Sequence, residues 1–316
     1  MRFAEFFSSR LSTLWVALVV VLAVAACAPR EPIPLPERPS IPFGEGRIWK
    51  VEGDDTAPSY VFGTYHISDP RVLDIPDAAE RAFRNAEIAV FEYKKERGKD
   101  PDPIDRDLTK LPSDMTLKGL VGAGTYGRLK SIMESRGYRP RNDVKPWVFW
   151  RYLGGYRGTF YTTDDESDPT RPVLDDWLRE RAWDAGKRVE GFETWEEGFA
   201  KFNTIPMDIQ VELLRGAVEN YYNRREGAPT VQFYLDGDLA MLHGLWEERM
   251  SRYSAEAAET LTFRIITNRN RIMADGMEPL MREASTFVAV GAGHLSGEDG
   301  ILRMLERRGY RVTRVH

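Results

Sequence analysis

Two patterns of the form Gly-x-x-His hold the residues best suited to chemistry, Gly63 to His66 and Gly291 to His294. They contain two of the four histidines in the chain. Each pattern comes at the end of an apolar run typical of a strand. Gly63, Gly291 and the extra Gly293 allow the chain to leave its strand sharply and a ligand to approach the backbone closely. The repetition predicts one site assembled from both ends of the chain, where two imidazoles meet at a metal ion or a substrate.

A carboxylate completes this set of residues. Glu92 lies at the carboxyl end of the run 87–93, whose uninterrupted apolar residues are typical of a strand covered on both faces. In open sheets with helical crossovers, ligands bind outside the carboxyl ends of the strands. We therefore expect His66, Glu92 and His294 to face one rim of a sheet. Two neutral imidazoles and one carboxylate match a three-ligand site for a divalent ion with open positions, which activates water for hydrolysis.

The two ends of the chain predict the same order of elements: a strand, the Gly-x-x-His pattern, a helix and a second strand. The amino-terminal elements are a hairpin of strands 47–51 and 60–63, a helix opening at Pro76-Asp77, and strand 87–93. The carboxyl-terminal elements are strand 285–290, helix 300–308 and strand 310–315. The sequence thus predicts an α/β fold in which two related strand-helix-strand halves form a central sheet.

The middle of the chain, from about residue 125 to 281, has mainly helical periodicity. Its aromatic residues, such as Trp147, Trp150 and Tyr152, are spaced as in a helical core rather than a cofactor site. One strand, 187–192, interrupts the pattern. We expect a largely helical insertion that covers the sheet.

The amino terminus is typical of an export signal. A basic start precedes the apolar run 14–26, which is too short to span a membrane comfortably. The run ends Val-Ala-Ala-Cys, which resembles a bacterial lipobox, so residues 1–26 are interpreted as a signal peptide and Cys27 as the lipidated residue. Residues 27–45 are rich in proline and predict an extended tether before a domain at 46–316. We expect an exported protein, anchored by lipid to the outer membrane and facing the periplasm.

Composition excludes several other classes of function. The formal net charge of −5 gives no reason to expect a nucleic-acid partner. Cys27 is the only cysteine, so the domain has no disulfide and its core must carry its stability. There is no Gly-x-Ser-x-Gly turn, no His-Glu-x-x-His helix and no phosphate-binding Gly-x-x-x-x-Gly-Lys.

These motifs resemble the TraB/PrgY/GumN family, which is related to the Tiki metalloproteases and more distantly to erythromycin-esterase-like and ChaN-like proteins. The resemblance rests on FGTYHISDP at 62–70, Phe91-Glu92 and the block FVAVGAGHLSGEDGILRMLERRGYRV at 287–312. Further landmarks follow in the family's order: Lys145-Pro146-Trp147, Gly186 to Val189, Gly191 to Thr194, Gly237-Asp238 and Arg269-Asn270 with Met273. The resemblance covers residues 46–316.

The resemblance implies an α/β fold of two related halves with a helical insertion. In Tiki-type members the two histidines and the strand-end glutamate are associated with a divalent metal and peptide cleavage, which points here to His66, His294 and Glu92. Arg269 and Asn270 match a pair that faces the same cleft in the family. There the Arg would polarise a carbonyl or hold a carboxylate, and the Asn would donate to an oxyanion.

The expected function is that of a lipid-anchored, metal-dependent hydrolase, a peptidase of the Tiki type using manganese, cobalt or zinc. In this hypothesis Glu92 is a metal ligand or the general base, and the substrate is a peptide or a small molecule. Two alternatives remain open. One is a non-catalytic lipoprotein that binds a peptide, haem or iron; the other is a metal-independent, esterase-like hydrolase with His66 or His294 as general base.

Overall fold

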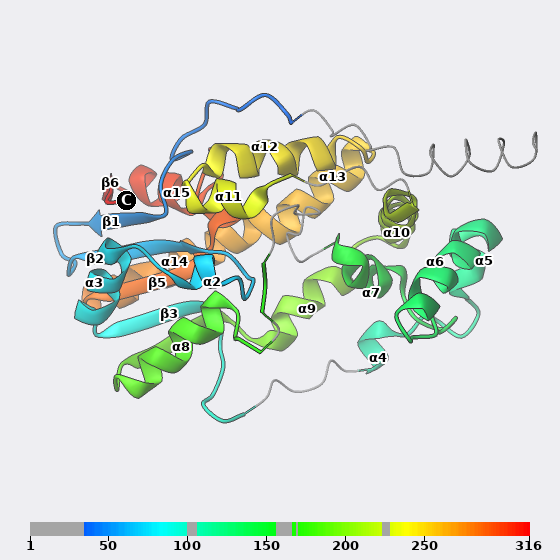
Figure 1. Cartoon of the computed structure of the whole chain (residues 1–316), viewed down its shortest axis with the longest axis horizontal. Coiled ribbons are helices and arrows are strands. Elements are labelled where there is room, and N and C mark those ends of the chain that lie inside the picture. Colours follow the sequence, from blue (N-terminus) through cyan, green and yellow to red (C-terminus); the bar gives the residue numbers. More distant parts are fainter. Residues whose placement is uncertain (1–34, 100–105, 156–165, 169, 223–227) are drawn as a thin grey trace, which may run out of the picture. The chain divides into compact units, whose positions relative to one another are not determined.

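The computed structural model in Figure 1 describes residues 35–99, 106–155, 166–168, 170–222 and 228–316. The predicted signal peptide, Cys27 and the start of the predicted tether lie outside this range. The described body runs from Leu35 to His316. None of the helices in these residues combines the length and apolar content needed to cross a membrane.

One mixed sheet of six strands organises the described residues. The strands are β1 (Ile48–Glu52), β2 (Ser59–Thr64), β3 (Ile88–Tyr93), β4 (Arg188–Glu193), β5 (Thr286–Gly291) and β6 (Arg311–Arg314), in the spatial order β4-β3-β5-β2-β1-β6. Neighbours from β4 to β2 are parallel, whereas β1 pairs antiparallel with both β2 and β6. The four parallel strands therefore end at one edge of the sheet.

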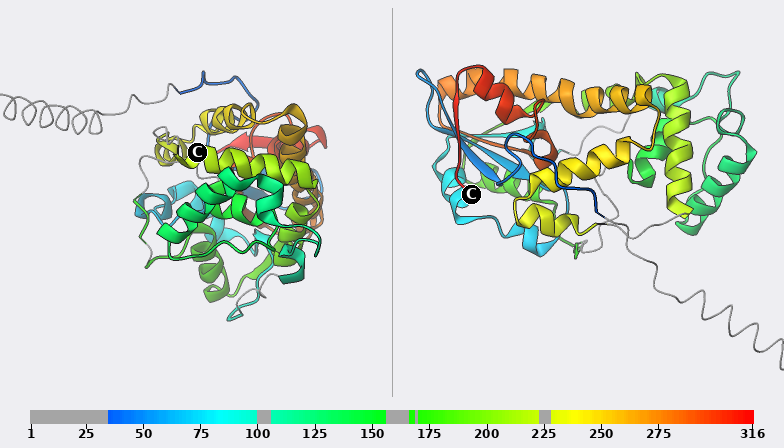
Figure 2. Two further views of the ribbon diagram at one scale, coloured as in Figure 1. Left: turned by 90° about the vertical axis from the view of Figure 1, so that its right-hand side faces the viewer. Right: turned by 90° about the horizontal axis from the view of Figure 1, so that it is seen from above.

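The two predicted halves are two crossovers that share this sheet. The first runs from β2 through α2 (Pro70–Leu73) and α3 (Asp77–Asn85) to β3, and the second runs from β5 through α15 (Ile301–Arg307) to β6. They travel in opposite directions along the sheet, which places their helices on opposite faces when both are right-handed. Figure 2 shows α3 on one side of the sheet and α15 on the other. The predicted α/β fold is confirmed.

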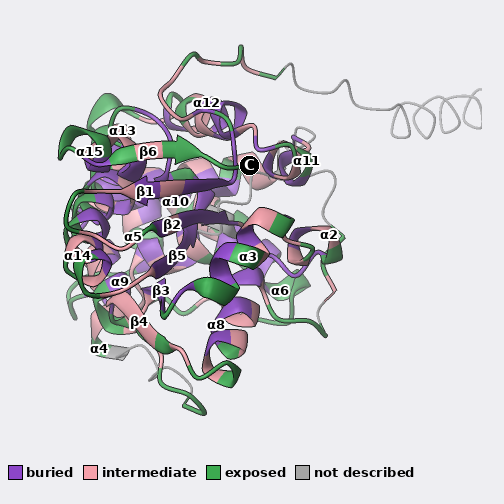
Figure 3. Cartoon of the chain, turned by 90° about the vertical axis from the view of Figure 1, so that its left-hand side faces the viewer, coloured by how far each residue is buried: buried purple, intermediate pink, exposed green. Residues whose placement is uncertain are grey.

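Helices on both faces explain why the central strands are apolar along their whole length. Every residue of β5 is buried, and in β3 only the last residue is partly exposed (Figure 3). Phe62 and Phe83 both pack against Phe287 in this core. The edge strand β6 has no such cover and is largely exposed. A continuous apolar run is thus typical of the central strands β3 and β5, whereas β4, which also ends at the site, is only partly buried.

Helices of the middle region form two groups. Those packed on the sheet core include α8 (Leu174–Asp184), α11 (Thr230–Leu235), α12 (Leu239–Met250) and α14 (Asn268–Glu283). A second hydrophobic core joins α5 (Leu117–Val121), α6 (Ala123–Ser135), α7 (Pro146–Trp150), α9 (Trp195–Asn203), α10 (Met207–Tyr222) and α13 (Ala255–Thr262). The short α4 (Arg106–Thr109) precedes α5, and a π-helical turn, η1 (Arg151–Gly155), follows α7. The predicted helical insertion thus covers the sheet and also has a core of its own.

The aromatic residues of α7 lie in the second core. Trp147 and Trp150 are buried there, and Trp147 stacks on Phe202 with ring centroids 5.7 Å apart. Tyr152, which we expected beside them, is 38% exposed. It lies in η1 two residues beyond Trp150, about 200° further round the helix axis, and therefore on the side away from the buried face.

The end of the predicted tether packs against the folded body. The N–H of Gly297 donates to the Pro42 carbonyl at 2.9 Å, and the N–H of Ala240 donates to the Gly44 carbonyl at 2.9 Å. Pro39 lies so close to Gly244 that a methyl group on this glycine would meet the proline ring at 3.0 Å. The ordered body therefore begins before residue 46, and its first segment contacts the loop that follows His294.

Candidate functional site

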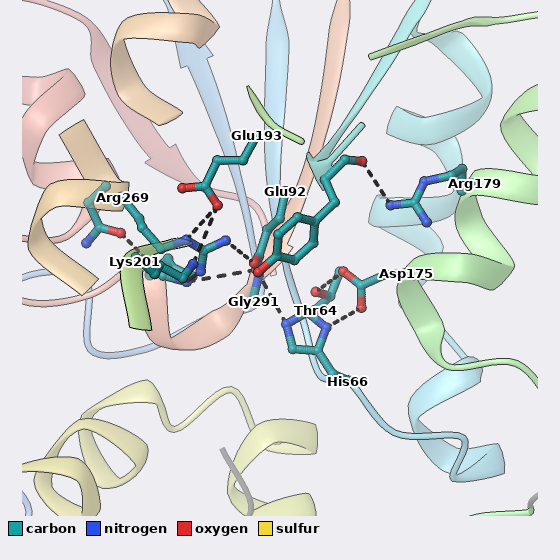
Figure 4. Close-up of polar contacts among 12 residues, drawn as sticks. Thr64, His66, Glu92, Asp175, Arg179, Glu193, Lys201, Arg269 and Gly291 are labelled. Carbon is teal, nitrogen blue, oxygen red and sulfur yellow. Dashed lines mark hydrogen bonds and ion pairs between the residues drawn. The ribbon is translucent and has the colours of Figure 1, made fainter. Parts of the chain in front are cut away.

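The carboxyl ends of the four parallel strands bring the expected side chains together; Figure 4 labels His66, Glu92 and Arg269 among them. Glu92 is the penultimate residue of β3, His66 follows β2, and His294 ends the short 3-10 turn η3 (Ala292–His294) after β5. The Nε2 atom of His66 lies 3.4 Å from Glu92 Oε1, and the Nε2 atom of His294 lies 3.9 Å from the same oxygen. The two Gly-x-x-His patterns thus converge on one carboxylate.

Glu92 is held in place by donors on both of its oxygens. Oε1 accepts from the N–H of Gly291 at 2.7 Å, and Oε2 accepts from Nη2 of Arg269 at 2.7 Å. The side chain is only 4% exposed. Burial alone would raise the pKa of Glu92, but the charge of Arg269 and the hydrogen bond from His66 hold that pKa well below its usual value. Glu92 is therefore a carboxylate at neutral pH.

His294 is a neutral imidazole whose tautomer is fixed by Asn270. The Asn270 Nδ2 donates to the Asp299 carbonyl at 2.6 Å, so its Oδ1 is the acceptor for Nδ1–H of His294 at 2.7 Å. The lone pair of His294 is consequently on Nε2, where it accepts from Nη1 of Arg269 at 2.9 Å. Burial lowers the pKa of His294 to about 3, against the attraction of Glu92 and with further lowering by the Arg269 charge.

The geometry assigns Asn270 a different role from the one expected. Both ends of its amide are engaged and the residue is fully buried. Because its Nδ2 is directed at the Asp299 carbonyl and the residue has no exposed surface, Asn270 orients the ring of His294 instead of reaching a substrate oxyanion.

His66 is bonded to a carboxylate that the sequence did not single out. Its Nδ1–H donates to Oδ2 of Asp175 at 2.7 Å, and Oδ1 of Asp175 accepts from the Thr64 hydroxyl at 2.8 Å. The His66 side chain is 49% exposed, which makes it the solvent-facing member of the site. Desolvation opposes its charge, but Asp175 and then Glu92 raise the pKa of His66 well above 6.5.

Arg269 is the centre of a buried charge cluster. Its Nε donates to Oε2 of Glu193 at 2.9 Å, while its two terminal nitrogens reach Glu92 and His294. Lys201 Nζ lies 3.6 Å from the same Glu193 oxygen. Burial lowers the pKa of Lys201 to about 7, with Arg269 adding to this effect.

Local sequence explains how Glu193 and Lys201 reach the site. Glu193 is the last residue of β4, and Thr194 immediately starts α9 with a capping box in which its side chain and that of Glu197 bond each other's backbone N–H. The helix then carries Lys201 back over the strand ends. Sequence reasoning missed both residues, although Glu193 directly follows the predicted strand 187–192. Asp175, in the first turn of α8, offered no comparable signal.

A π-helical turn directly precedes the Arg-Asn pair. The segments α13, η2 (Phe263–Thr267) and α14 follow without a break, and the residues at both junctions keep right-handed helical backbone angles. Arg269 and Asn270 are the second and third residues of α14 and are both buried. Such turns are frequent at functional sites because they shift the face that a helix presents.

The three motif glycines have different roles. A methyl group on Gly63 would meet Leu295 Cδ1 at 2.9 Å, so this glycine allows β2 to pack closely against the turn after β5. A methyl group on Gly291 would lie 3.0 Å from both Glu92 Oε1 and His66 Nε2. Gly291 therefore leaves open the space where these donors meet. Nothing lies within 4 Å of the corresponding position on Gly293.

The donors match a divalent ion in chemical type and tautomer. Both Nε2 atoms are directed toward the Glu92 carboxylate, and both Nδ1–H groups donate to an oxygen, as metal-binding histidines usually do. The missing methyl of Gly291 keeps the space between His66 and Glu92 open. Within the part of the chain that the structure describes, no group of three His, Cys, Asp or Glu side chains reaches the geometry of a metal site. The lone pair on Nε2 of His294 accepts a hydrogen bond from Nη1 of Arg269 and is not available to a metal ion in this arrangement.

Comparison with known families supports the resemblance seen in the motifs. Residues 47–314 match the TraB/PrgY/gumN family. This range covers the whole sheet and its helices. The chain belongs to this family. All the site residues described above lie within the matched range.

Curated relatives of this TraB/PrgY/gumN protein are named as metalloproteases. They include a Metalloprotease TIKI homolog from Amphimedon queenslandica (22% identical; 85% of this chain, 61% of the relative). Metalloprotease TIKI1 of Danio rerio is 24% identical over 84% of this chain and 62% of the relative. Human Metalloprotease TIKI1 is 25% identical over 84% and 61%. The chain thus spans about three fifths of the length of these relatives. No solved structure matches the chain.

Proposed function

We propose that this family member is a metal-dependent hydrolase that cleaves peptides. One observation carries the proposal: two imidazoles converge on one buried carboxylate. His66 and His294 both place Nε2 within 4 Å of Glu92 Oε1. The relatives named as metalloproteases support the same reaction class. Such donors suit manganese, cobalt or zinc.

In this proposal His66, Glu92 and His294 hold the ion. A bound divalent ion supplies a Lewis acid and lowers the pKa of a coordinated water to about 7. His66 must give up its extra proton before Nε2 can bind a metal, so loading the site releases protons. Asp175 and Asn270 keep the two rings in the tautomer that presents Nε2.

The remaining groups stabilise charge and direct the substrate. Arg269 is the buried cation nearest to Glu92 and His294, and a guanidinium there stabilises negative charge that develops on a carbonyl oxygen. His66 is the half-exposed member of the site, whereas the side chains of Glu92 and Arg269 are 4% and 2% exposed. A peptide therefore approaches from the His66 side.

A specific observation favours a second candidate, a metal-independent hydrolase. The lone pair of His294 is already bonded to Arg269, and His66 forms a carboxylate-imidazole pair with Asp175. In that mechanism the neutral form of His66 takes a proton from water and returns it to the leaving group, with Asp175 stabilising the imidazolium.

Metal analysis and a peptide-library cleavage assay on the full chain, supplemented in turn with manganese, cobalt and zinc, test the first proposal. We expect stoichiometric metal in the wild type and a loss of at least about tenfold in metal content and cleavage in His294→Ala. His243→Ala is the matched control, because His243, in α12 beside Glu247 and packed against Gly297, is not one of the proposed ligands. Stoichiometric metal in His294→Ala would contradict the assignment. Cleavage that survives exhaustive chelation would favour the second candidate.

We also propose that the protein is exported and held at the outer membrane, facing the periplasm, by a lipid on Cys27. Fractionation of cells that express the wild type or Cys27→Ser tests this. The wild type should sediment with outer membranes and the variant should not; equal sedimentation of both would contradict the proposal.

A further inference from the structure

Arg269 occupies the donor atoms that the proposed metal ion would need. Its Nη1 lies 2.9 Å from Nε2 of His294, and its Nη2 lies 2.7 Å from Oε2 of Glu92. The Asn270 amide fixes the tautomer of His294, so Nε2 carries the ring's available lone pair. A guanidinium hydrogen bond and a metal ion cannot use that lone pair at the same time.

The charge of Arg269 also does what a metal ion would do for this site. The side chains of Glu92 and Glu193 are 4% and 8% exposed, and both are ion-paired with Arg269. A buried carboxylate without a partner is strongly unfavourable. Arg269 is therefore a cation, supplied by the protein itself, of the kind that these buried carboxylates require.

Glu193 provides a fixed point about which Arg269 can turn. It accepts from Nε, the nitrogen nearest the backbone end of the guanidinium, at 2.9 Å, and Lys201 lies 3.6 Å from the same oxygen. Glu193 is not one of the proposed metal ligands. The bond to Nε can persist while the terminal nitrogens change partners.

We propose that Arg269 is a built-in competitor for the divalent ion, bonded to His294 and Glu92 in the metal-free protein and displaced from His294 when the ion binds. This rests on the metal-binding part of the proposed function. The ion binds only the fraction of molecules in which Nη1 has left His294, so the apparent affinity is lower than the donors alone would give. Displacement frees Nη1 as a donor while Nε stays on Glu193.

Metal affinity measured by equilibrium dialysis with Zn²⁺ and Mn²⁺ tests this in the wild type, Arg269→Gln and Arg179→Gln. We expect Arg269→Gln to bind metal at least about tenfold more tightly than the wild type. Arg179→Gln is the matched control: Arg179 is also buried, but it pairs with Asp176 and packs over Phe91. The metal Kd of this control should stay within about twofold of the wild type.

A second measurement is made on the wild-type protein and needs a variant only to assign the signals. In wild-type protein with ¹⁵N-labelled arginine, the Nη signals of Arg269, assigned by their loss in Arg269→Lys, should shift when one equivalent of Zn²⁺ is added, and its Nε–H signal should persist. Unchanged Nη signals at full Zn²⁺ occupancy would overturn the proposal, as would equal Kd values for wild type and Arg269→Gln.

The outcomes separate this inference from the proposed function. Equal, tight metal binding by the wild type and Arg269→Gln would remove the inference and leave the metal-dependent hydrolase intact. Metal binding by Arg269→Gln but not by the wild type would support the inference and contradict the proposed function. Absence of binding in both proteins would overturn both.

Discussion

His66 and His294 end the same four-residue pattern and differ in nearly everything around them. His66 is half-exposed and donates to the carboxylate of Asp175 from α8. His294 is buried, donates to the neutral amide of Asn270 from α14, and accepts from the cationic Arg269. Consequently the pKa of His66 is raised well above 6.5, while that of His294 is lowered to about 3.

The difference shows that the motif sets the place of each imidazole, whereas the helices set its charge. Two titratable groups whose surroundings drive their pKa values apart can take different roles in acid-base chemistry. His66 is the proton carrier of the pair, whereas His294 stays a neutral imidazole. Glu92 is the group that both histidines share.

The largest effect should come from removing that shared carboxylate. Glu92→Gln keeps the side-chain shape but leaves His66 and Arg269 without its charge, so hydrolysis should fall by about 10²- to 10⁴-fold. Breaking the buried pair with Arg269 should also lower the free energy of unfolding by about 3–5 kcal/mol, measured by urea denaturation. The control Glu190→Gln, at a surface pair with Arg188, should stay within about 0.5 kcal/mol. A Glu92→Gln protein as stable and active as the wild type would remove Glu92 from the site.

The next effect tests the partner of His66. Asp175→Asn should lower the pKa of His66, as followed by NMR titration of its ring, because the Asp175 charge that raises this pKa is lost. Activity should fall by about 10- to 100-fold, as is typical when the residue that orients a metal-binding histidine is lost. Asp176→Asn, one residue further along α8 and 42% exposed in its side chain, is the control. An unchanged His66 pKa in Asp175→Asn would contradict the role of Asp175 in setting the charge of His66, and with it the contrast between the two histidines.

The glycines of the second pattern allow a sharper comparison within one turn. Gly291→Ala places a methyl group 3.0 Å from Glu92 Oε1 and His66 Nε2, and should cost about 1–3 kcal/mol of stability along with part of the activity. Gly293→Ala meets nothing within 4 Å and should change stability by less than about 0.5 kcal/mol. Thermal unfolding and the cleavage assay measure both. Equal effects in the two variants would argue against a space kept open by Gly291.

The smallest effect is a change of slope in the dependence of stability on pH, measured by urea unfolding in the presence of a chelator. Between pH 6.5 and 4.5 the unfolded chain binds a proton at His294 that the folded chain excludes, so the free energy of unfolding falls as pH is lowered. Above pH 6.5 the folded chain keeps a proton on His66 that the unfolded chain loses, so this contribution falls as pH rises. His294→Asn should flatten the acid side and His66→Asn the alkaline side.

The difference in the free energy of unfolding between each variant and the wild type, measured at each pH, isolates the contribution of that histidine. Lys201, with its pKa lowered to about 7 from 10.5, makes stability rise with pH over that interval and opposes His66. The same loss of slope on both sides in either variant would contradict the opposite surroundings of the two histidines.

The positions of the site residues could be predicted from sequence, and their partners could not. Strand-like apolar runs and the rule that ligands bind at carboxyl strand ends are enough to gather His66, Glu92 and His294. Asp175 is separated from His66 by 109 residues and comes from a helix, and which helical residue faces a strand end depends on tertiary packing. The same holds for Lys201. Asn270 was found in the sequence, but only its bonds to His294 and Asp299 show that it positions rather than donates to substrate.

The number of residues in the π-helical turn η2 determines how the second core is aligned with the site. On its amino-terminal side α13 buries Ala257 and Leu261 in the second core, and on its other side α14 presents Arg269 and Asn270. Each residue added to or removed from a helix rotates the rest of that helix by about 100°. A single deletion within Phe263–Thr267 would therefore leave one of these two faces misaligned. Although Phe263 itself is 46% exposed, the number of residues in this turn is constrained as tightly as the identity of the side chains in the site.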